Sequence, residues 1–307
     1  LIDAGPAWRS PMPGVWSPSA AYALGRELAA LSLAFQDHYG AALADFDSQL
    51  AVAPADASAR LARAQIRRWR GWVAAAAADV ARVQALEPDS HQAWALAGHL
   101  ALDGRRYADA EQILQQIVTR EPDARDTLEL AERWTIHDSP ELSVDAAGGR
   151  SDGGAFSSRD WRTDAYWFSA PVRHRYRLFA HDTASWGRFD EGVGRDHRLG
   201  AGIEYRRPRW SARGELYRGL EDDRSAGAAV DGDWRFDDHL SFSLGGAVNS
   251  RDVPLRGVRI GVQGDAVEAG VRYRWHESRD LSVSAGLLDL SDGNTREWGS
   301  AAFTTRV

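Results

Sequence analysis

Three prolines divide the first half of the chain at equal intervals, and this spacing limits the possible folds more than any other feature. Pro54, Pro88 and Pro122 are each 34 residues apart. Proline ends a helix because its ring fixes φ and removes a backbone donor. A 34-residue period is that of the tetratricopeptide repeat, a pair of antiparallel helices. The first half is therefore predicted to be a stack of helical hairpins.

Other positions keep the same period in roles that helix packing requires. Small residues recur in two phases, at Ala42, Ala76 and Ala110 and at Ala30, Ala64 and Gly98. A third phase carries larger apolar side chains, Phe46, Val80 and Leu114. We expect the small residues where two helices approach closely, and the larger ones between neighbouring hairpins.

The helical region is predicted to cover residues 1–137. Its repeats are expected near 23–56, 57–90 and 91–124, closed by a capping helix at 125–134. The segment before residue 20 is expected to be the turn region of an earlier repeat. Arg67, Arg68 and Arg70 form either a binding patch or a solvated helix face.

After about residue 138 the period changes from 3.6 to 2, which is typical of half-buried strands. In the segment 267–276, Val267, Val271 and Trp275 alternate with Glu268 and Arg272. Similar alternation occurs at 199–206, 210–218, 226–236 and 240–249. Strands of about 9–11 residues cross a bilayer when they are tilted. Residues 138–307 are therefore predicted to form about ten strands of an antiparallel outer-membrane β-barrel.

The connections between these strands alternate in length. Long connections are expected at 148–159, 182–196 and 249–264, with a medium one at 220–225 and a longer one at 290–297. Short ones are expected at 171–174, 206–209, 236–239 and 276–280. Outer-membrane barrels have short periplasmic turns and longer external loops. The first strand, near 140–147, runs into a long loop, which places the helices in the periplasm.

A barrel needs every strand edge paired. The chain ends inside the tenth predicted strand, so we expect the barrel to be incomplete, with closing strands missing after it. No basic-then-apolar leader opens the chain, and we expect earlier residues as well. A soluble repeat protein with a β-sandwich is the alternative, because its strands would also alternate.

One face of the predicted barrel is charged and is the candidate lumenal face. Its members are Glu204, Arg213, Glu215, Tyr217, Asp231, Asp233, Glu268, Arg272 and Arg274. Arg235 shares this face. These residues either contact a cargo or form salt bridges between neighbouring strands. Tyr217 either stacks on a ligand ring or fills the lumen.

Catalysis, cofactors and metals are not predicted. The chain has no Cys, which excludes disulfides and thiol chemistry. It contains no zinc-protease, nucleophile-elbow or P-loop motif. His174, His181 and His197 are expected to be scattered over strand ends and a loop. The net charge of −7 gives no electrostatic reason for a nucleic-acid partner.

Six short stretches along the chain are distinctive: GPAW (5–8), SRDW (158–161), GAGIEYR (200–206), DVPLRG (252–257), YRWHESRDL (273–281) and SDGN (291–294). In these stretches the chain resembles one known family, the export porins for poly-β-1,6-N-acetyl-D-glucosamine of Gram-negative bacteria. Members of this family join periplasmic tetratricopeptide repeats to a C-terminal barrel, in that order.

The resemblance implies export of a biofilm polysaccharide through the outer membrane, with no enzymatic step and no cofactor. The repeats would guide partly deacetylated polymer into the barrel. A periplasmic polysaccharide deacetylase and outer-membrane lipid are the implied partners. Two other readings stay open: an exporter of another polysaccharide such as cellulose, and a periplasmic protein-binding scaffold that the barrel only anchors.

Overall fold

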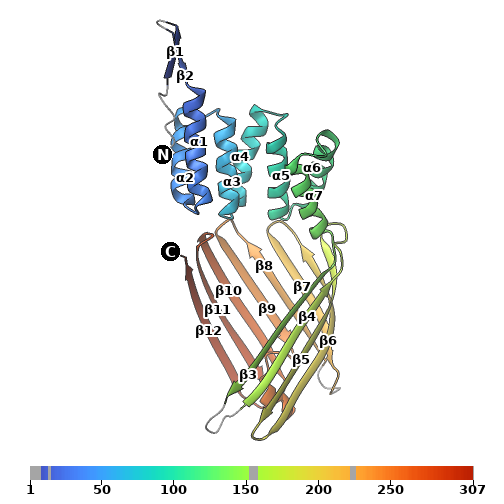
Figure 1. The fold of residues 1–307 in the computed structure, drawn as a ribbon. Helices are drawn as coiled ribbons and strands as arrows, with labels where there is room; N and C mark the ends of the chain where they lie inside the picture. The colour runs from blue at the N-terminus through green and yellow to red at the C-terminus, as the bar shows by residue number, and fades with distance from the viewer. Residues whose placement is uncertain (1–7, 13–14, 152–157, 222–225, 307) are drawn as a thin grey trace. The chain divides into compact units, whose positions relative to one another are not determined.

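The computed structural model describes residues 8–12, 15–151, 158–221 and 226–306. The chain divides into two compact units, the first mainly of helices and the second mainly of strands (Figure 1). The first comprises Leu1–Gly104 with Asp109–Leu130, and the second Arg105–Ala108 with Ala131–Val307. The predicted fold class, a solenoid of helical hairpins followed by an antiparallel sheet, is confirmed.

Seven helices follow one another between residues 20 and 137, with one hairpin in each 34-residue period. They are α1 (Ala20–Phe35), α2 (Tyr39–Val52), α3 (Ala57–Trp69), α4 (Val73–Leu86), α5 (His91–Asp103), α6 (Tyr107–Arg120) and α7 (Arg125–His137). No helix in the described ranges combines the length and apolar content that crossing a bilayer would require.

The turn inside each hairpin follows the same period in its backbone geometry. Asp37, Gly71 and Arg105 have φ of 62°, 79° and 57° and are spaced by 34 residues. A left-handed residue just after a helix ends it by satisfying its last carbonyls. The next hairpin begins at a capping residue: the Asp56 side chain accepts a hydrogen bond from the Ala59 amide at 3.0 Å.

The repeated small residues lie at the helix contacts. Ala30, Ala42, Ala64 and Ala76 have no solvent exposure, and neither does Phe46. A methyl group at the Gly98 position would overlap the Leu130 side chain. The position therefore needs its small residue, because interiors are close-packed and overpacking strains them.

The arginines of the second hairpin form neither a solvated face nor an open patch, contrary to both expectations. Arg67 donates to Asp79 at 2.8 Å, and Arg68 donates to Asp103 at 2.7 Å. The Arg70 guanidinium lies 4.6 Å above the centre of the Trp72 ring. These side chains tie α3 to α4 and α5, so they belong to the helix packing.

Asp79 is the centre of this packing. It is 3% exposed and accepts hydrogen bonds from Arg60 at 3.3 Å, from Arg63 at 2.6 Å and from Arg67. Arg60 is itself only 5% exposed. A buried charge is tolerated only when it is paired and hydrogen-bonded. One carboxylate thus accepts hydrogen bonds from three arginines of a single helix.

The segment before residue 20, predicted to be the turn region of an earlier repeat, contains two strands. Strands β1 (Trp8–Met12) and β2 (Val15–Pro18) form an antiparallel pair in which Arg9 faces Ser17. Residues 1–7 and 13–14 lie outside the described ranges.

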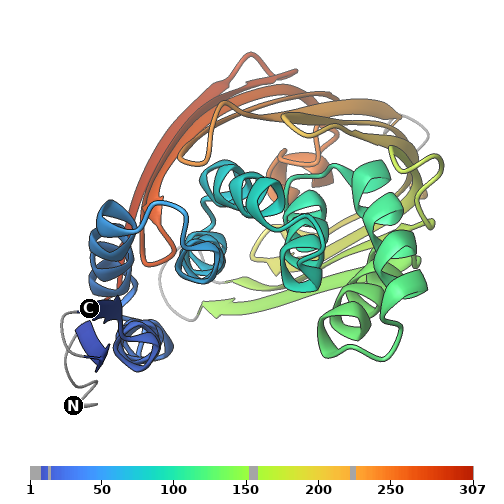
Figure 2. The same ribbon diagram turned by 90° about the horizontal axis from the view of Figure 1, so that it is seen from above.

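Ten strands form one antiparallel sheet in simple sequence order. They are β3 (Glu141–Ser151), β4 (Ser158–Phe168), β5 (Tyr176–Phe189), β6 (Gly192–Arg206), β7 (Trp210–Gly219), β8 (Gly227–Arg235), β9 (Leu240–Val248), β10 (Gly264–His276), β11 (Arg279–Leu290) and β12 (Thr295–Thr305). The sheet curves around an interior, with β3 and β12 as its two edges (Figure 2).

Alternate residues of each strand face opposite sides of this curved sheet. On β5, Arg177, Phe179 and His181 are buried, whereas Tyr176 and Leu178 are exposed. The outer face carries exposed apolar and aromatic side chains such as those of Leu199, Ile203, Trp210, Leu216, Trp234, Phe242, Val267 and Trp275. The inner face carries the charged residues. A polar interior inside an apolar outer band is the pattern of membrane barrels.

The long connection predicted at 182–196 is wrong. Strands β5 and β6 have 14 and 15 residues and pair without interruption up to Phe189 and Gly192. Only Asp190 and Glu191 form the turn. The Gly, Asp and Arg content suggested a loop, but the antiparallel ladder satisfies its backbone polar groups just as well. The connection predicted at 148–159 is also shorter, since β3 ends at Ser151 and β4 begins at Ser158. The connection predicted at 220–225 agrees with the bounds of β7 and β8, which end at Gly219 and begin at Gly227. Residues 152–157 and 222–225 lie outside the described ranges.

Replacing Asp79 by Asn should destabilise the helices by about 3–5 kcal/mol, because buried guanidinium groups lose their counter-charge. Urea unfolding followed by helical circular dichroism measures this. Asp47→Asn is the matched control, since Asp47 also pairs with Arg63 but is 57% exposed. We expect it to cost less than about 1 kcal/mol. Equal losses in the two variants would contradict the central role of Asp79.

The β8–β9 turn supplies a pH-dependent prediction. The Asp237 carboxylate accepts hydrogen bonds from the backbone amides of Leu240 and His239, which lower its pKa below the ordinary 3.8. The turn should therefore be fully stabilised above pH 3.8 and should loosen as pH falls through the lowered pKa. Amide exchange at His239 and Leu240 should accelerate in this range, and Asp237→Asn should remove the pH dependence.

Candidate functional site on the inner face of the sheet

The strand register brings the predicted polar residues into rows across the inner face. One row crosses five strands, from β6 to β10, through Glu204, Arg213, Asp231, Gly245 and Glu268. The charges alternate in sign along β6, β7 and β8. Arg213 donates to Asp231 at 3.1 Å across two strands. Opposite charges on directly facing residues stabilise a sheet.

The other predicted residues have separate partners. Asp233 accepts a hydrogen bond from Ser211 on the facing strand. Arg272 forms an ion pair with Asp280 at 3.3 Å. The Arg274 backbone amide donates to the His239 carbonyl at 2.8 Å. Glu204 forms an ion pair with Arg206 on its own strand at 3.2 Å. Salt-bridging is thus present on this face, beside exposed charges such as Glu268.

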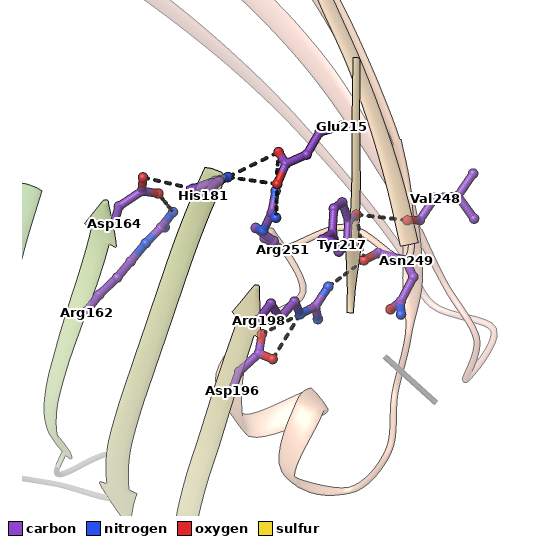
Figure 3. A network of polar contacts seen from close by, with 10 residues as sticks. All are labelled: Arg162, Asp164, His181, Asp196, Arg198, Glu215, Tyr217, Val248, Asn249 and Arg251. Carbon is purple, nitrogen blue, oxygen red and sulfur yellow. Dashed lines mark hydrogen bonds and ion pairs between the residues drawn. The ribbon is translucent and has the colours of Figure 1, made fainter. Parts of the chain in front are cut away.

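Glu215 and Tyr217 belong to a buried network with residues that the sequence did not single out (Figure 3). At its centre is His181 of β5, which is 2% exposed. One ring nitrogen lies 3.0 Å from Glu215 of β7, and the other lies 3.1 Å from Asp164 of β4. The Tyr166 ring stacks on the imidazole with 3.7 Å between the centroids. The network therefore links β4, β5 and β7 across the inner face.

Arg251 completes the network from outside the sheet. It lies in the connection of residues 249–263 between β9 and β10, which we call the β9–β10 loop. Both of its terminal nitrogens donate to Glu215, at 3.0 and 2.5 Å. Its guanidinium lies 3.8 Å above the centre of the Tyr217 ring. A forked cation is thus held between a carboxylate and an aromatic face.

The start of the β9–β10 loop is pinned by the same group of side chains. Tyr217 shares its hydroxyl between the carbonyls of Val248 and Asn249, at 2.9 and 3.0 Å. Arg198 donates to the Asn249 carbonyl at 2.5 Å and to Asp196 at 2.9 Å. Asn249 has a φ of 52°, which turns the chain sharply at this point. The loop therefore leaves β9 towards the inner face.

The β9–β10 loop continues into a short helix, α8 (Leu255–Arg259), which rests on β5 and β6. Positions Gly187 and Gly194 face the Leu255 side chain, because a methyl group there would lie 3.1 and 3.0 Å from it. Arg259 donates to the carbonyl of Glu191 in the β5–β6 turn at 2.9 Å. The loop thus crosses the inner face from β9 to β6. The sequence predicted its length but not this course.

Sequence reasoning missed Asp164, Arg198 and Arg251, and it placed His181 wrongly. His181 lies in the middle of a strand, not at a strand end or in a loop as predicted. The alternation of Arg177, Phe179 and His181 with exposed residues could have placed it on the inner face. No periodic signal marks Arg251, because its position depends on the fold of the loop. Within the described ranges, no three His, Asp or Glu side chains converge as metal ligands.

Comparison with known proteins identifies the class of this structure. The family model described as the PgaA membrane β-barrel domain matches residues 136–306. The match covers more than half of the chain, and the chain belongs to this family of membrane barrels.

Two relatives extend the likeness into the helices. The poly-β-1,6-N-acetyl-D-glucosamine export protein of Escherichia coli K12 is 28% identical over 264 residues, as is that of Escherichia coli O157:H7. The alignment covers 83% of this chain and 32% of each relative. The chain thus spans about a third of the length of these export proteins.

Among solved structures, a bacterial polysaccharide outer-membrane secretin is 26% identical, with a TM-score of 0.48. That match covers 56% of this chain and 58% of the secretin. The first tetratricopeptide domain of Spaghetti, bound to an HSP90 peptide, is 16% identical with a TM-score of 0.34. It covers 37% of this chain and 90% of that domain.

Replacing Tyr217 by Phe should destabilise the barrel by about 1–3 kcal/mol, because the carbonyls of Val248 and Asn249 lose a shared donor, the second of them in a buried hydrogen bond. The denaturant midpoint of the heat-modifiable band on gels measures this in the full-length protein. Tyr273→Phe is the matched control, because Tyr273 is on the outer face and 39% exposed. It should shift stability by less than about 0.5 kcal/mol. A loss no greater for Tyr217 than for Tyr273 would show that the hydroxyl does not anchor the loop.

Proposed function

We propose that this chain is part of an outer-membrane exporter of poly-β-1,6-N-acetyl-D-glucosamine. The observation that carries the proposal is the likeness to the Escherichia coli export proteins, which extends through both the helices and the strands. Membership of the membrane-barrel family supports the outer-membrane location. The relatives are export proteins, so the proposed role is transport without a catalytic step.

The helices would lie in the periplasm and guide partly deacetylated polymer towards the barrel. Deacetylation converts acetamides into amines, which are cationic at neutral pH. A periplasmic deacetylase is the proposed protein partner, and outer-membrane lipid is the proposed surroundings of the apolar outer face. Tetratricopeptide arrays present extended concave surfaces that suit such binding.

The inner face would conduct the polymer through many weak contacts. Its proposed contact residues are Glu204, Arg213, Glu215, Tyr217, Asp231, Asp233, Glu268, Arg272 and Arg274. Carboxylates attract the ammonium groups of the cargo, while the interleaved arginines limit the depth of attraction at each site. Conduction needs sites that are favourable to enter and weak enough to leave. The row of Glu204, Arg213 and Asp231, in which negative and positive charges alternate, would offer contacts of this kind.

Two alternatives have distinct outcomes in one assay. An exporter of another polysaccharide, such as cellulose, would restore secretion of that polymer and not of poly-N-acetylglucosamine. A periplasmic scaffold anchored by the barrel would bind proteins through its helices without conducting polymer. The single curved sheet excludes the third alternative, a soluble β-sandwich, because a sandwich has two packed sheets.

The test expresses the full-length gene in a strain without its own exporter and measures surface and periplasmic poly-N-acetylglucosamine. The test variant has amides in place of Glu204, Glu215, Asp231, Asp233 and Glu268. We expect the wild type to export and the variant to lose surface polymer by about tenfold or more, because negative charges along the path concentrate a cationic ligand.

A charge-conserving variant is the matched control, with Asp and Glu exchanged at the same five positions. It should retain more export than the amide variant, and heat-modifiable migration should show that both barrels assemble. Equal export by wild type and amide variant would remove these residues from the path. Failure of the wild type to restore any surface polymer would contradict export of this polymer.

A further inference from the structure

The β9–β10 loop is held at both ends, and its helix α8 is held to the β5–β6 turn by Arg259. Arg251 is the charged side chain that joins the first part of the loop to β7. At its beginning, the Ser250 amide donates to Gly264 at 2.6 Å. At its end, the Gln263 amide donates to Ser291 at 3.0 Å. Between these points Arg251 reaches Glu215 of β7, while α8 rests on the glycines of β5 and β6. The ion pair of Arg251 with Glu215 thus connects the loop to the strand network.

The site that Arg251 occupies has the groups needed to bind a cation. Glu215 is held from its other side by His181, and Tyr217 presents its ring below the guanidinium. The Glu215 side chain is 6% exposed and that of Arg251 is 14% exposed. Nevertheless, the Arg251 Nε is buried without a hydrogen-bond partner in the described structure. The site therefore binds the charge and both terminal nitrogens of Arg251 but leaves its Nε without a hydrogen bond.

The loop is not fully packed against the strands beneath it. A cavity of about 280 Å³ lies at the same end of the sheet. Its lining includes Arg198 of β6 and Asn249, Val258, Gly261 and Val262 of the loop. Gly261 has a φ of 82°, a second left-handed position after Asn249. The cavity leaves space beside the two ends of the loop, where these turns lie.

We propose that Arg251 is a detachable latch on a cation subsite formed by Glu215 and Tyr217, and that an ammonium group of an amino sugar displaces it. This inference rests on the proposed function for the source of the amine. Displacement would free the β9–β10 loop from the inner face while the subsite stays neutralised. The loop would therefore open in response to the cationic cargo and not to neutral sugar.

The exchange is chemically balanced. One cation replaces another on Glu215, so no buried carboxylate is left unpaired at the end of the exchange. An ammonium is a compact charge with three donors, whereas the guanidinium is a planar fork. The Tyr217 ring can attract either cation. An acetylated sugar has no charge at this position and cannot compete with Arg251.

The absence of cysteine allows a direct probe of the loop. Gly194→Cys and Leu255→Cys place two thiols where α8 meets β6, since a β-carbon at Gly194 would lie 3.0 Å from the Leu255 Cγ. Such proximity permits a disulfide when the loop is closed. The rate of thiol loss under a weak oxidant then reports the closed fraction in the full-length protein. The probe ligand is a tetramer of β-1,6-linked glucosamine, and its fully N-acetylated form is the control ligand.

We expect the glucosamine tetramer to slow cross-linking at least about threefold and the acetylated tetramer to leave the rate unchanged. Arg251→Gln should slow it to a similar extent without ligand and abolish the response. Arg256→Gln is the matched control from the same loop, because its partner Glu191 is 50% exposed and 3.6 Å away. It should keep both the rate and the response.

Unchanged cross-linking in Arg251→Gln would overturn the latch, as would equal effects of the two tetramers. Arg251→Lys retains the cation and should keep a response, which excludes misfolding as the cause of the Arg251→Gln result. The export assay is independent of this measurement. A ligand response in a protein that exports no polymer would refute the proposed function alone. Export by a protein whose loop ignores both ligands would refute the latch alone.

Discussion

The antiparallel hydrogen-bond ladder that joins ten consecutive strands determines which side of the sheet each side chain faces. Because successive residues point to opposite faces, a shift of one residue in any strand would exchange its two faces. The uninterrupted pairing of β5 with β6 keeps His181 and Glu204 on the same side over the full length of both strands. The charged rows and the buried network are consequences of this register.

Within that register, glycine residues leave the space that large inner-face side chains need. Gly200 and Gly202 of β6 leave the space that the Glu215 and Phe179 side chains occupy. Gly227 of β8 does the same for the Tyr217 ring. These positions weaken a strand by themselves, since glycine adds no packing and loses more entropy on folding. Their presence on the inner face allows a dense group of charged and aromatic side chains on a strongly curved sheet.

Much of this architecture could be predicted from the sequence because it is periodic. The 34-residue spacing locates the helical hairpins, and the alternation around Glu215 and Asp231 gives their common face correctly. The turn at Asp190 and Glu191 was not predictable in this way, since glycine and charge are common to loops and to polar strand faces. The position of Arg251 depends on a loop that folds back over distant strands. Local patterns contain no information about such a contact.

The hairpin turns at Asp37, Gly71 and Arg105 share one backbone geometry with three different side chains. The helical unit thus repeats one backbone geometry. A whole 34-residue period could be gained or lost while the remaining turns keep their positions in the repeat. The sheet has the opposite property, because one inserted residue in a strand would turn charges towards the apolar face. The two units therefore tolerate different kinds of length variation: the helices in steps of a repeat, and the strands only at their turns.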